Sequence, residues 1–302
     1  SAFLRSVFEC AGLKTGMFTS PHLVDFRERI QVQGDMISKE DTMRLGNRLL
    51  SMDFGVCPTM FDYCLAMALL YFKEQKCDVV ILETGLGGTY DSTNACGVPD
   101  VTVIAKIGFD HMAILGDTLA QIAAEKAGII KHGTALVLES QEKEAMDVLN
   151  KAAERADIKT IKVVNLDEIR ILPQKDGKQC FSYAGYDAVT MKMLGVHQYE
   201  NAVAAMLAAE LFFEKYFAGK KNVPERKALQ HAIREGIDRT QWMGRMELVS
   251  NDPFFLMDGA HNSNGVEALK KSLETMYPDE KFHFIMGVMA DKDYGEMIRE
   301  LL

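Results

Sequence analysis

Apolar residues recur along this chain at two spacings, and the two kinds of segment alternate. Residues 78–82 (DVVIL) and 101–105 (VTVIA) are apolar, β-branched runs without alternation, which is typical of strands buried on both faces of a sheet. Strands that alternate with helices indicate an α/β fold: a mostly parallel sheet flanked by helices. In the first half we predict a helix at 1–11 with Gly12 as its stop, a strand at 16–20, helices at 59–74 and 118–131, and a strand at 134–140.

The pattern changes twice in the second half of the chain. Residues 165–192 consist of short β-like pieces with turns, which indicates a small antiparallel excursion. The further predicted elements are helices at 198–217 and 224–235 with Gly236 as the stop of the second, strands at 246–250, 254–258 and 281–288, and helices at 264–276 and 296–302. We therefore expect one domain at 1–241 and the first part of a Rossmann-like C-terminal domain at 242–302.

Composition narrows the class of protein. The chain is 48% hydrophobic and 25% charged, which fits a folded globular protein with a large core. Its net charge of −9 argues against nucleic-acid binding, and no apolar run approaches membrane-spanning length. Six cysteines without C-x-x-C spacing indicate reduced thiols, and not zinc ligands or disulfides. We expect a cytoplasmic protein.

The most informative stretch is ETGLGGTYDSTNAC, residues 83–96, directly after the first buried strand. It places Glu83 and three glycines at the carboxyl end of a parallel strand, where open α/β sheets bind ligands. Glu83 is suited to a metal ion or a substrate amine. A tight turn with a solvated glutamate is the other interpretation, and this run alone leaves both open.

Lys126 is unusual because it lies on the apolar side of a predicted helix, at helical spacing from Leu119, Ile122 and Ile129. A charged lysine in such a position costs on the order of several kcal/mol unless it is paired or neutralised. Burial would lower its pKa and leave a neutral amine that can react with CO₂. The alternative is a lysine with a buried stem and a solvated ammonium group.

Several blocks in a fixed order resemble a known family. They are FTSPHLVDFRERIQVQG at 18–34, the glycine-rich run at 83–96, KIGFDHMAILGDTLAQIAAEKAGIIK at 106–131, GVHQYENA at 195–202, WMGRMELV at 242–249 and MDGAHNSNG at 257–265. In this order the chain closely resembles folylpolyglutamate synthases and dihydrofolate synthases of the Mur ligase family. The resemblance covers essentially all 302 residues.

The family's phosphate-binding loop has no counterpart in the sequence. A glycine-rich block ending in GKGS would be expected just ahead of the first helix, and no G-x-x-x-x-G-K-[ST] occurs. The last predicted helix also has no cap and no following strand. We therefore expect the sequence to be an internal fragment of a longer ligase, inactive by itself.

The resemblance implies ATP-driven amide bond formation. A folate γ-carboxylate, or dihydropteroate, would form an acyl phosphate with the γ-phosphate of ATP, and the amine of L-glutamate would displace phosphate. The implied cofactor is Mg²⁺, with a monovalent cation as a further candidate. The implied partners are a reduced folate or dihydropteroate, L-glutamate and ATP, and the family precedent is a monomer.

The resemblance also implies roles for individual residues. Glu83 and His111 match the family's magnesium ligands, and Lys126 matches a lysine that is carbamylated so that its new carboxylate binds magnesium. These three form the implied catalytic group. Ser20, in a Ser-Pro-His turn, resembles a further metal or phosphate contact. The residues alone would suggest a satisfied histidine at a strand exit for His111 and an ordinary turn serine for Ser20.

Two further sets of residues carry over from the resemblance. The positions implied in ATP binding are Asn201, Arg245, Asp258 and His261. Their structural alternatives are an amide inside a helix, a surface arginine and an aspartate that caps a helix. The positions implied in binding the pterin or folate are Thr59, Phe61, Asp62, Tyr90, Asp91 and Ser92. Phe61 could stack on a flat ring, although a core aromatic at a helix start is more common.

Two departures from the family leave the substrate preference open. Thr89 stands where the family usually has arginine, and Asp62 stands where it usually has glutamate. Two other functions remain as alternatives: a Mur-type ligase with another substrate, and a non-catalytic folate-binding pseudoenzyme. The blocks of the pterin pocket argue against the first. The retained metal and lysine positions argue against the second.

Overall fold

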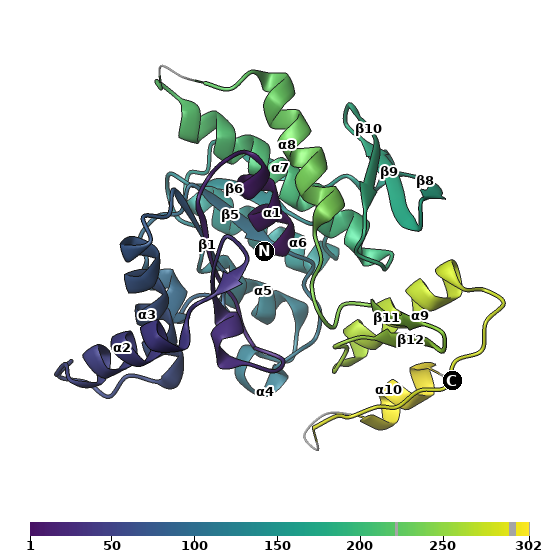
Figure 1. Ribbon diagram of the computed structural model, residues 1–302, viewed down its shortest axis with the longest axis horizontal. Helices are drawn as coiled ribbons and strands as arrows, with labels where there is room; N and C mark the ends of the chain where they lie inside the picture. Colours follow the sequence, from purple (N-terminus) through teal and green to yellow (C-terminus); the bar gives the residue numbers. More distant parts are fainter. Residues whose placement is uncertain (221–222, 290–293, 302) are drawn as a thin grey trace.

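The computed structural model describes residues 1–220, 223–289 and 294–301, in which helices and strands alternate along much of the chain (Figure 1). The helices are α1 (Ala2–Cys10), α2 (Lys39–Leu50), α3 (Met60–Glu74), α4 (Met112–Leu115), α5 (Leu119–Ala127), α6 (Lys143–Arg155), α7 (His197–Phe217), α8 (Arg226–Arg239), α9 (Ser263–Met276) and α10 (Tyr294–Leu301). The strands are β1 (Thr15–Phe18), β2 (Ile30–Val32), β3 (Asp35–Met36), β4 (Val79–Leu82), β5 (Val101–Ile104), β6 (Ala135–Leu138), β7 (Ile161–Val163), β8 (Arg170–Lys175), β9 (Lys178–Tyr183), β10 (Tyr186–Met191), β11 (Glu247–Asn251) and β12 (Phe254–Met257).

The parallel strands lie in two separate sheets. In the first sheet, β1 pairs in parallel with β4 and antiparallel with β2, and β3 continues the antiparallel edge. In the second sheet, β5, β6 and β7 are all parallel. The predicted α/β fold with parallel strands flanked by helices is therefore confirmed. The division between β4 and β5 was not predicted.

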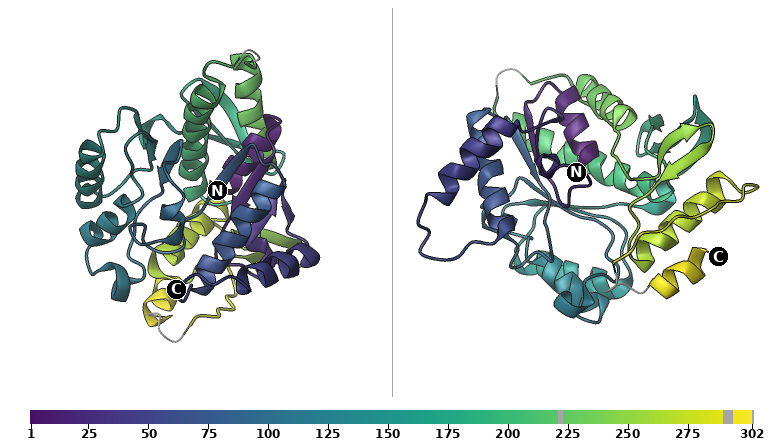
Figure 2. Two further views of the ribbon diagram at one scale, coloured as in Figure 1. Left: turned by 90° about the vertical axis from the view of Figure 1, so that its left-hand side faces the viewer. Right: turned by 60° about the horizontal axis from the view of Figure 1, so that its bottom comes forward.

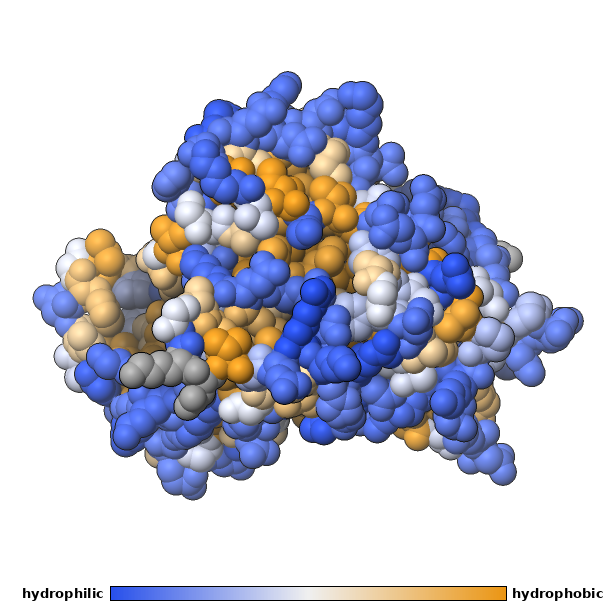
Figure 3. All heavy atoms as spheres, turned by 90° about the horizontal axis from the view of Figure 1, so that it is seen from above, coloured by the Kyte–Doolittle hydropathy of each residue, from blue (hydrophilic) through white to orange (hydrophobic). Residues whose placement is uncertain are grey.

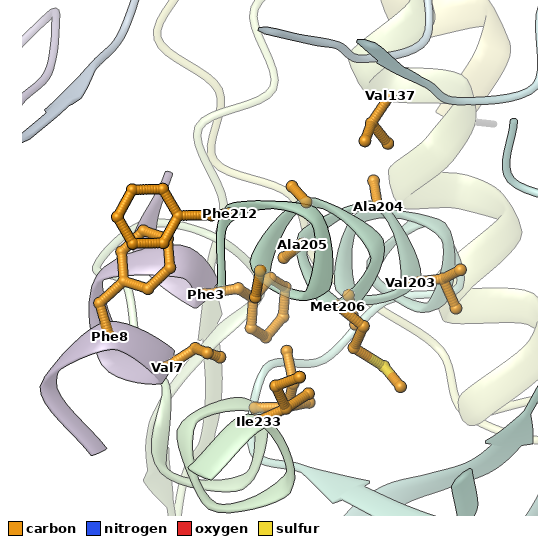
Figure 4. Packing of buried hydrophobic residues seen from close by; sticks show 14 of the residues in the cluster. Phe3, Val7, Phe8, Val137, Val203, Ala204, Ala205, Met206, Phe212 and Ile233 are labelled. Carbon is orange, nitrogen blue, oxygen red and sulfur yellow. The ribbon is translucent and has the colours of Figure 1, made fainter. Parts of the chain in front are cut away.

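One layer of helices covers the same face of both sheets. Helices α1, α7 and α8 pack there in a single buried cluster that includes Met17 of β1, Ile81 of β4 and Val137 of β6. Figure 4 shows Phe3 of α1 and Phe212 of α7 within this packing. On the opposite face, α2 and α3 cover the first sheet, whereas α5 and α6 cover the second. The shared helix layer makes the two sheets parts of one α/β domain.

Gly236 lies inside α8, so the prediction that it stops this helix is wrong. A Cβ atom at Gly236 would lie 2.4 Å from the Cα atom of Val7 in α1. Only glycine allows the two helix backbones to approach this closely. A glycine within a helical pattern can thus serve packing, and α8 continues to Arg239.

Other predictions can be compared directly with the elements. The antiparallel excursion is confirmed as the sheet β10-β9-β8. The helix predicted at 118–131 ends at Ala127. The strand predicted at 281–288 is wrong: these residues are described and form no strand, and Ile285 is 98% exposed. An extended segment without a neighbouring strand gains no ladder hydrogen bonds. The last predicted helix is confirmed as α10, and Leu302 lies outside the described residues.

The region after residue 242 has a small core of its own. It consists of the antiparallel hairpin β11–β12 with α9 and α10. Its buried cluster joins Met246 and Leu273 to Leu194 of the preceding region. Figure 1 shows α9 and α10 at the opposite end of the molecule from α2 and α3. This region therefore depends on few buried residues.

The start of the chain lies in the middle of the molecule, as both views in Figure 2 show. Seen from above, the surface is largely hydrophilic, with an apolar area near its centre (Figure 3). Among residues 1–220, 223–289 and 294–301, no helix is both long and apolar enough to span a membrane.

Candidate functional site

The carboxyl ends of three parallel strands border a cavity of about 1080 Å³. Glu83 follows β4, Lys106 follows β5 and Glu139 follows β6, and all three line the cavity. Three further residues of the predicted site line it as well: Lys126 of α5, Asn201 of α7 and Arg245. The fold thus assembles residues from distant parts of the sequence at the edge where α/β proteins bind ligands.

Glu83 is a half-buried carboxylate beside several hydrogen-bond donors and positive charges. Burial raises its pKa, while the guanidinium of Arg245 and a hydrogen bond from the backbone of Ser20 lower it. Burial has the larger effect. The nearby positive charge and hydrogen bond therefore do not fully offset the cost of removing this carboxylate from water. The backbone of Ser20 therefore lies beside the Glu83 carboxylate.

Lys126 lies where its spacing on α5 predicted, on the side that faces the core. Ile122, one turn earlier, is 1% exposed, and Lys126 itself is partly buried. Burial lowers the pKa of Lys126, and the nearby Asp110 carboxylate opposes this effect only in part. The amine borders the large cavity and also a second cavity of about 320 Å³. Lys126 is one of the residues that line both cavities.

Asp110 organises the second cavity. Its carboxylate accepts a hydrogen bond from the side-chain amide of Asn262 at 2.8 Å. The Nε2 atoms of His111 and His261 lie 3.8 and 4.0 Å from the same oxygen. The N–H of His111 donates to the other oxygen of Asp110 at 2.8 Å, which holds His111 at φ 50. His111 and Lys126 both line this second cavity.

The glycine loop, residues 84–88, is held from both ends. The carboxylate of Asp91 accepts hydrogen bonds from the backbone of Gly85 at 2.9 Å and of the next residue at 3.0 Å. The N–H and hydroxyl of Thr89 donate to the carbonyl of Glu125 in α5, at 2.9 and 3.1 Å. The departure at Thr89 thus has a structural role: it ties the loop to the helix that carries Lys126.

Close packing adds to these hydrogen bonds. A Cβ atom at Gly88 would lie 2.6 Å from the carbonyl oxygen of Glu125, and one at Gly85 would lie 2.7 Å from the ring of Phe61. The Phe61 ring also contacts Phe18, with centroids 5.4 Å apart. The structure therefore places Phe61 against the loop and the core, as the core-aromatic alternative expects.

Asp62 connects the start of α3 to the segment after the glycine loop. Thr59 is the N-cap of α3, and the Asp62 carboxylate accepts hydrogen bonds from the backbone N–H and the hydroxyl of Thr59, each 2.7 Å long. The other oxygen of Asp62 accepts from the Ser92 hydroxyl at 2.5 Å. Tyr90 is 91% exposed. Thr59, Asp62 and Ser92 are thus brought together, whereas Tyr90 points to solvent.

The residues predicted to bind ATP are only partly assembled. Asn201 and Arg245 line the large cavity. Asp258 accepts from the backbone N–H groups of Met246 and Ala260, both at 2.8 Å, and it does not cap α9. The N-cap of α9 is Asn262, whose side chain accepts from the N–H of Gly265 at 2.8 Å. The interpretation of Asp258 as a helix cap was therefore wrong. Asp258 fixes a turn instead.

Several residues at the cavities were not singled out from the sequence. Asp110 precedes His111 and Asn262 follows His261, and both histidines were predicted site residues. This adjacency is the feature of the sequence that could have indicated Asp110 and Asn262. Asn264 donates to the carbonyl of Phe109 at 2.8 Å. Glu139 is buried, and burial, together with the Glu200 carboxylate, raises its pKa to about 7. A buried acid that ends a strand gives no periodic signal in a sequence.

The side chains present fit a magnesium ion by their chemistry. Mg²⁺ prefers carboxylate oxygens, and Glu83 offers a half-buried carboxylate whose charge is not fully compensated. Among the described residues, no group of three or more His, Cys, Asp or Glu side chains is arranged to hold a metal ion by itself. A carboxylate on Lys126 would add a ligand from the helix that borders both cavities. A magnesium site here would therefore need a carboxylate on Lys126 in addition to the side chains of Glu83 and His111.

Comparison with known proteins places the chain in a family. The Mur ligase middle domain matches residues 55–209, and the Mur ligase glutamate ligase domain matches residues 244–302. The chain is 37% identical to the dihydrofolate synthase/folylpolyglutamate synthase of Bacillus subtilis, over 99% of this chain and 70% of that protein. It is 36% identical to a folylpolyglutamate synthase of Arabidopsis thaliana, over 89% of this chain and 47% of that protein. It thus spans about half the length of the plant relative.

A solved structure agrees with these sequence matches. The E. coli protein FolC, in complex with DHPP and ADP, has a TM-score of 0.81 and 28% identity, covering 99% of this chain and 68% of that one. This chain therefore belongs to the Mur ligase family, in the group of folylpolyglutamate and dihydrofolate synthases.

Proposed function

We propose that the protein is an ATP-dependent ligase that adds L-glutamate to the γ-carboxylate of a reduced folate, to dihydropteroate, or to both, through an acyl phosphate. One observation carries this proposal: Glu83, Lys126, Asn201 and Arg245 line the same cavity. The related E. coli structure contains DHPP and ADP, and this supports substrates of the same classes here. The protein would act as a cytoplasmic monomer with a domain boundary near residue 242.

In this proposal one part of the site binds the nucleotide and another binds the folate. Arg245 would bind phosphate oxygens through its fork of donors, and Asn201 would hold the base or ribose. Asp258 and His261 would position the turn of the C-terminal region that adjoins the nucleotide. Mg²⁺, when bound, would neutralise phosphate charge during transfer. Glu83, His111 and Ser20 would hold it.

Lys126 would contribute a carboxylate after carbamylation. Its neutral amine attacks CO₂, a C–N bond forms, and one proton leaves to solvent. The lowered pKa of Lys126, caused by burial, makes the neutral amine more abundant. The product is anionic and lies within reach of the same cavity as Glu83.

The folate side of the site would be formed by the glycine loop and its neighbours. Asp91 and Asp62 hold the loop and the segment after it. Thr59, Phe61, Tyr90 and Ser92 would complete the surface that receives the pterin or folate. Tyr90 is exposed and free to cover a flat ring.

The test is made on the full-length gene product with ATP, Mg²⁺ and L-glutamate. We expect ADP formation and glutamate addition, seen by mass spectrometry, with either tetrahydrofolate or dihydropteroate. Lys126→Ala should lower kcat by about 100-fold or more, and acetate should restore part of it. ADP release without any glutamylated product, with either acceptor, would reject the proposal.

A further inference from the structure

Two side chains tie the end of α5 to the segment that follows the glycine loop. The side-chain amide of Asn94 donates to the carbonyl of Thr89 and to the carbonyl of Gly128, both at 3.1 Å. The ammonium group of Lys131 donates to the carbonyls of Asn94 and Gly97, the latter at 2.7 Å. We call the side chains of Asn94 and Lys131 the α5 clamp.

Asn94 satisfies a carbonyl at the end of a helix. Gly128 is the C-cap of α5, and the last carbonyls of a helix have no N–H donor within it. One hydrogen of the Asn94 amide serves this carbonyl, and the other serves the carbonyl of Thr89. A single side chain therefore holds the end of the helix and the end of the loop together.

The two segments that the α5 clamp joins pack backbone against backbone. A Cβ atom at Gly128 would lie 2.3 Å from the hydroxyl oxygen of Thr89 and 2.5 Å from its Cα atom. A Cβ atom at Gly88 would lie 3.1 Å from the Cα atom of Lys126. Segments in such close contact cannot move toward each other, so hydrogen bonds that also keep them from separating fix their relative position.

Lys131 holds Asn94 in its turn. Asn94 lies in the short 3-10 helix Ser92–Ala95, and its N–H donates to the carbonyl of Asp91 at 2.9 Å. Lys131 binds the carbonyls of Asn94 and Gly97, near the end of this short helix and just beyond it. Because these acceptors belong to the backbone, Lys131 fixes the course of the chain from which the Asn94 side chain extends.

Lys126 stands between the two points at which the loop segment holds α5. The carbonyl of Glu125 accepts from the N–H and the hydroxyl of Thr89, at 2.9 and 3.1 Å. The carbonyl of Gly128 accepts from Asn94. Glu125 directly precedes Lys126, and Gly128 comes two residues after it. Contacts on both sides of Lys126 therefore fix the direction in which its side chain leaves the helix.

We propose that Asn94 and Lys131 are positioning residues of the ligase, which hold Lys126 in the orientation that its reaction with CO₂ and its place beside Glu83 require. Glu83, Lys126 and both residues of the α5 clamp line the same cavity. This inference rests on the proposed function, because it gives the clamp a part in that reaction. The clamp acts through Lys126 and not through the substrates.

Steady-state kinetics of the full-length gene product test the proposal. Lys131→Met keeps an unbranched side chain and removes the donors. It should lower kcat by about 10-fold or more, since a small displacement of a reacting group has effects of this size. The KM for ATP should change by less than about twofold, because the clamp does not act on nucleotide binding. A kcat within about twofold of the native value would overturn the proposal.

Lys215→Met is the matched control. The ammonium group of Lys215 also donates to a backbone carbonyl, that of Gly133 at 3.3 Å, and pairs with Asp100 at 2.9 Å. These contacts lie outside α5 and the glycine loop, so K215M should leave kcat unchanged. If K215M lowers kcat as much as K131M does, the loss reflects general destabilisation and the proposal is overturned.

A double-mutant cycle shows whether the clamp acts through Lys126. In the Lys126→Ala protein with acetate present, Lys131→Met should lower kcat by less than about twofold, because the side chain to be positioned is gone. Asn94→Ala should depend on Lys126 in the same way. Equal losses with and without Lys126 would mean that the clamp residues act independently of it, and this would overturn the proposal.

Hydrogen–deuterium exchange provides a measurement that needs no activity. Amides at 126–130 should exchange at least about 10-fold faster in K131M and in N94A than in the native protein, whereas K215M should leave them unchanged. If the native full-length protein forms no glutamylated product, the proposed function fails, and faster exchange in the clamp variants would still support the positioning of Lys126. Unchanged exchange at 126–130 in both clamp variants would overturn the inference.

Discussion

The two sides of the site are held in different ways. The glycine loop donates backbone hydrogen bonds to the Asp91 carboxylate, Thr89 donates to the backbone of α5, and the loop packs against that backbone. The C-terminal region reaches the same place through Asn262 and Asn264, which bond to the segment around Asp110. Its own core is small. One side is thus part of a rigid domain, whereas the other rests on a few polar contacts.

This difference indicates how the site would operate. Groups that must hold a substrate in a fixed position benefit from a rigid surround. A region attached by few contacts can move relative to it, as domains joined by a short linker commonly do. We therefore expect the folate side to be preorganised and the nucleotide side to close and open.

The largest expected effect comes from placing a Cβ atom in a close backbone contact between the glycine loop and α5. Gly88→Ala would place a Cβ atom 2.6 Å from the carbonyl of Glu125, and neither backbone can move easily. We expect a loss of about 3 kcal/mol in the free energy of unfolding, measured by urea denaturation.

A second glycine provides the control for this change. Gly46 lies in α2, and a Cβ atom there would lie 3.5 Å from the end of the Met67 side chain, an ordinary contact. Gly46→Ala should leave stability unchanged or raise it by up to about 1 kcal/mol, because alanine favours helix. Equal effects of the two variants would show that the loop is not rigidly packed.

The second effect removes a hydrogen-bond acceptor from the loop. Asp91→Asn leaves one acceptor oxygen for the backbone N–H groups of Gly85 and its neighbour and for Thr93. We expect a loss of about 1–2 kcal/mol in stability and a higher KM for the folate substrate with a smaller change in kcat. Asp53→Asn is the control, since exposed Asp53 accepts a hydrogen bond from the backbone of Gly55 in a surface loop. An unchanged KM would contradict the role in holding the loop.

The sequence predicted many individual helices and strands on both sides of the site. The runs at 78–82 and 101–105 and the spacing around Lys126 place the strands and helices of the core, because periodicity reports burial. It failed where a contact between distant segments decides the structure. In the sequence Gly236 looks like a helix stop, but in the fold it lies inside α8 and packs against the backbone of Val7. The segment at 281–288 looks like a strand, but a strand also needs a neighbour.

The site was predicted through the resemblance more than through spacing. Glu83 and Lys126 stood out from the residues alone, since each conflicts with its predicted surroundings. Asp110 did not, because its importance comes from Asn262 in another part of the chain. Contacts of this kind leave no local pattern in a sequence.

The third effect concerns pH. Hydrogen bonds from the Ser92 hydroxyl and from Thr59 lower the pKa of Asp62 from its usual value of 3.8. The folded state therefore favours the ionised form, so this contribution to stability is present above about pH 4 and is lost as the pH falls through the lower, folded-state pKa. Because Asp62 is partly exposed, we expect no more than about 1 kcal/mol.

Unfolding experiments between about pH 6 and pH 2.5 measure this contribution. The stability difference between the native protein and Asp62→Asn should be largest near pH 6 and should shrink toward pH 2.5. Asp117→Asn, at an exposed position ahead of α5, is the control. A difference that grows on acidification would mean that the sign of the pKa shift is wrong.

The smallest effect on stability should come from the movable side. Asn264→Ala removes the hydrogen bond to the carbonyl of Phe109 and leaves the cap of α9 at Asn262 intact. Loss of one exposed hydrogen bond costs about 0.5–1.5 kcal/mol, and alanine regains about 0.5 kcal/mol in helix propensity, so global stability should change by less than about 1 kcal/mol. Exchange of the amides at 107–111 should nevertheless become at least about fivefold faster, because this contact holds the C-terminal region against that segment. Asn150→Ala, exposed on α6, should leave the exchange at 107–111 unchanged and raise global stability by about 0.5 kcal/mol through helix propensity alone. If Asn264→Ala lowers global stability as much as Gly88→Ala does, the two sides are one rigid unit and the contrast between them does not hold.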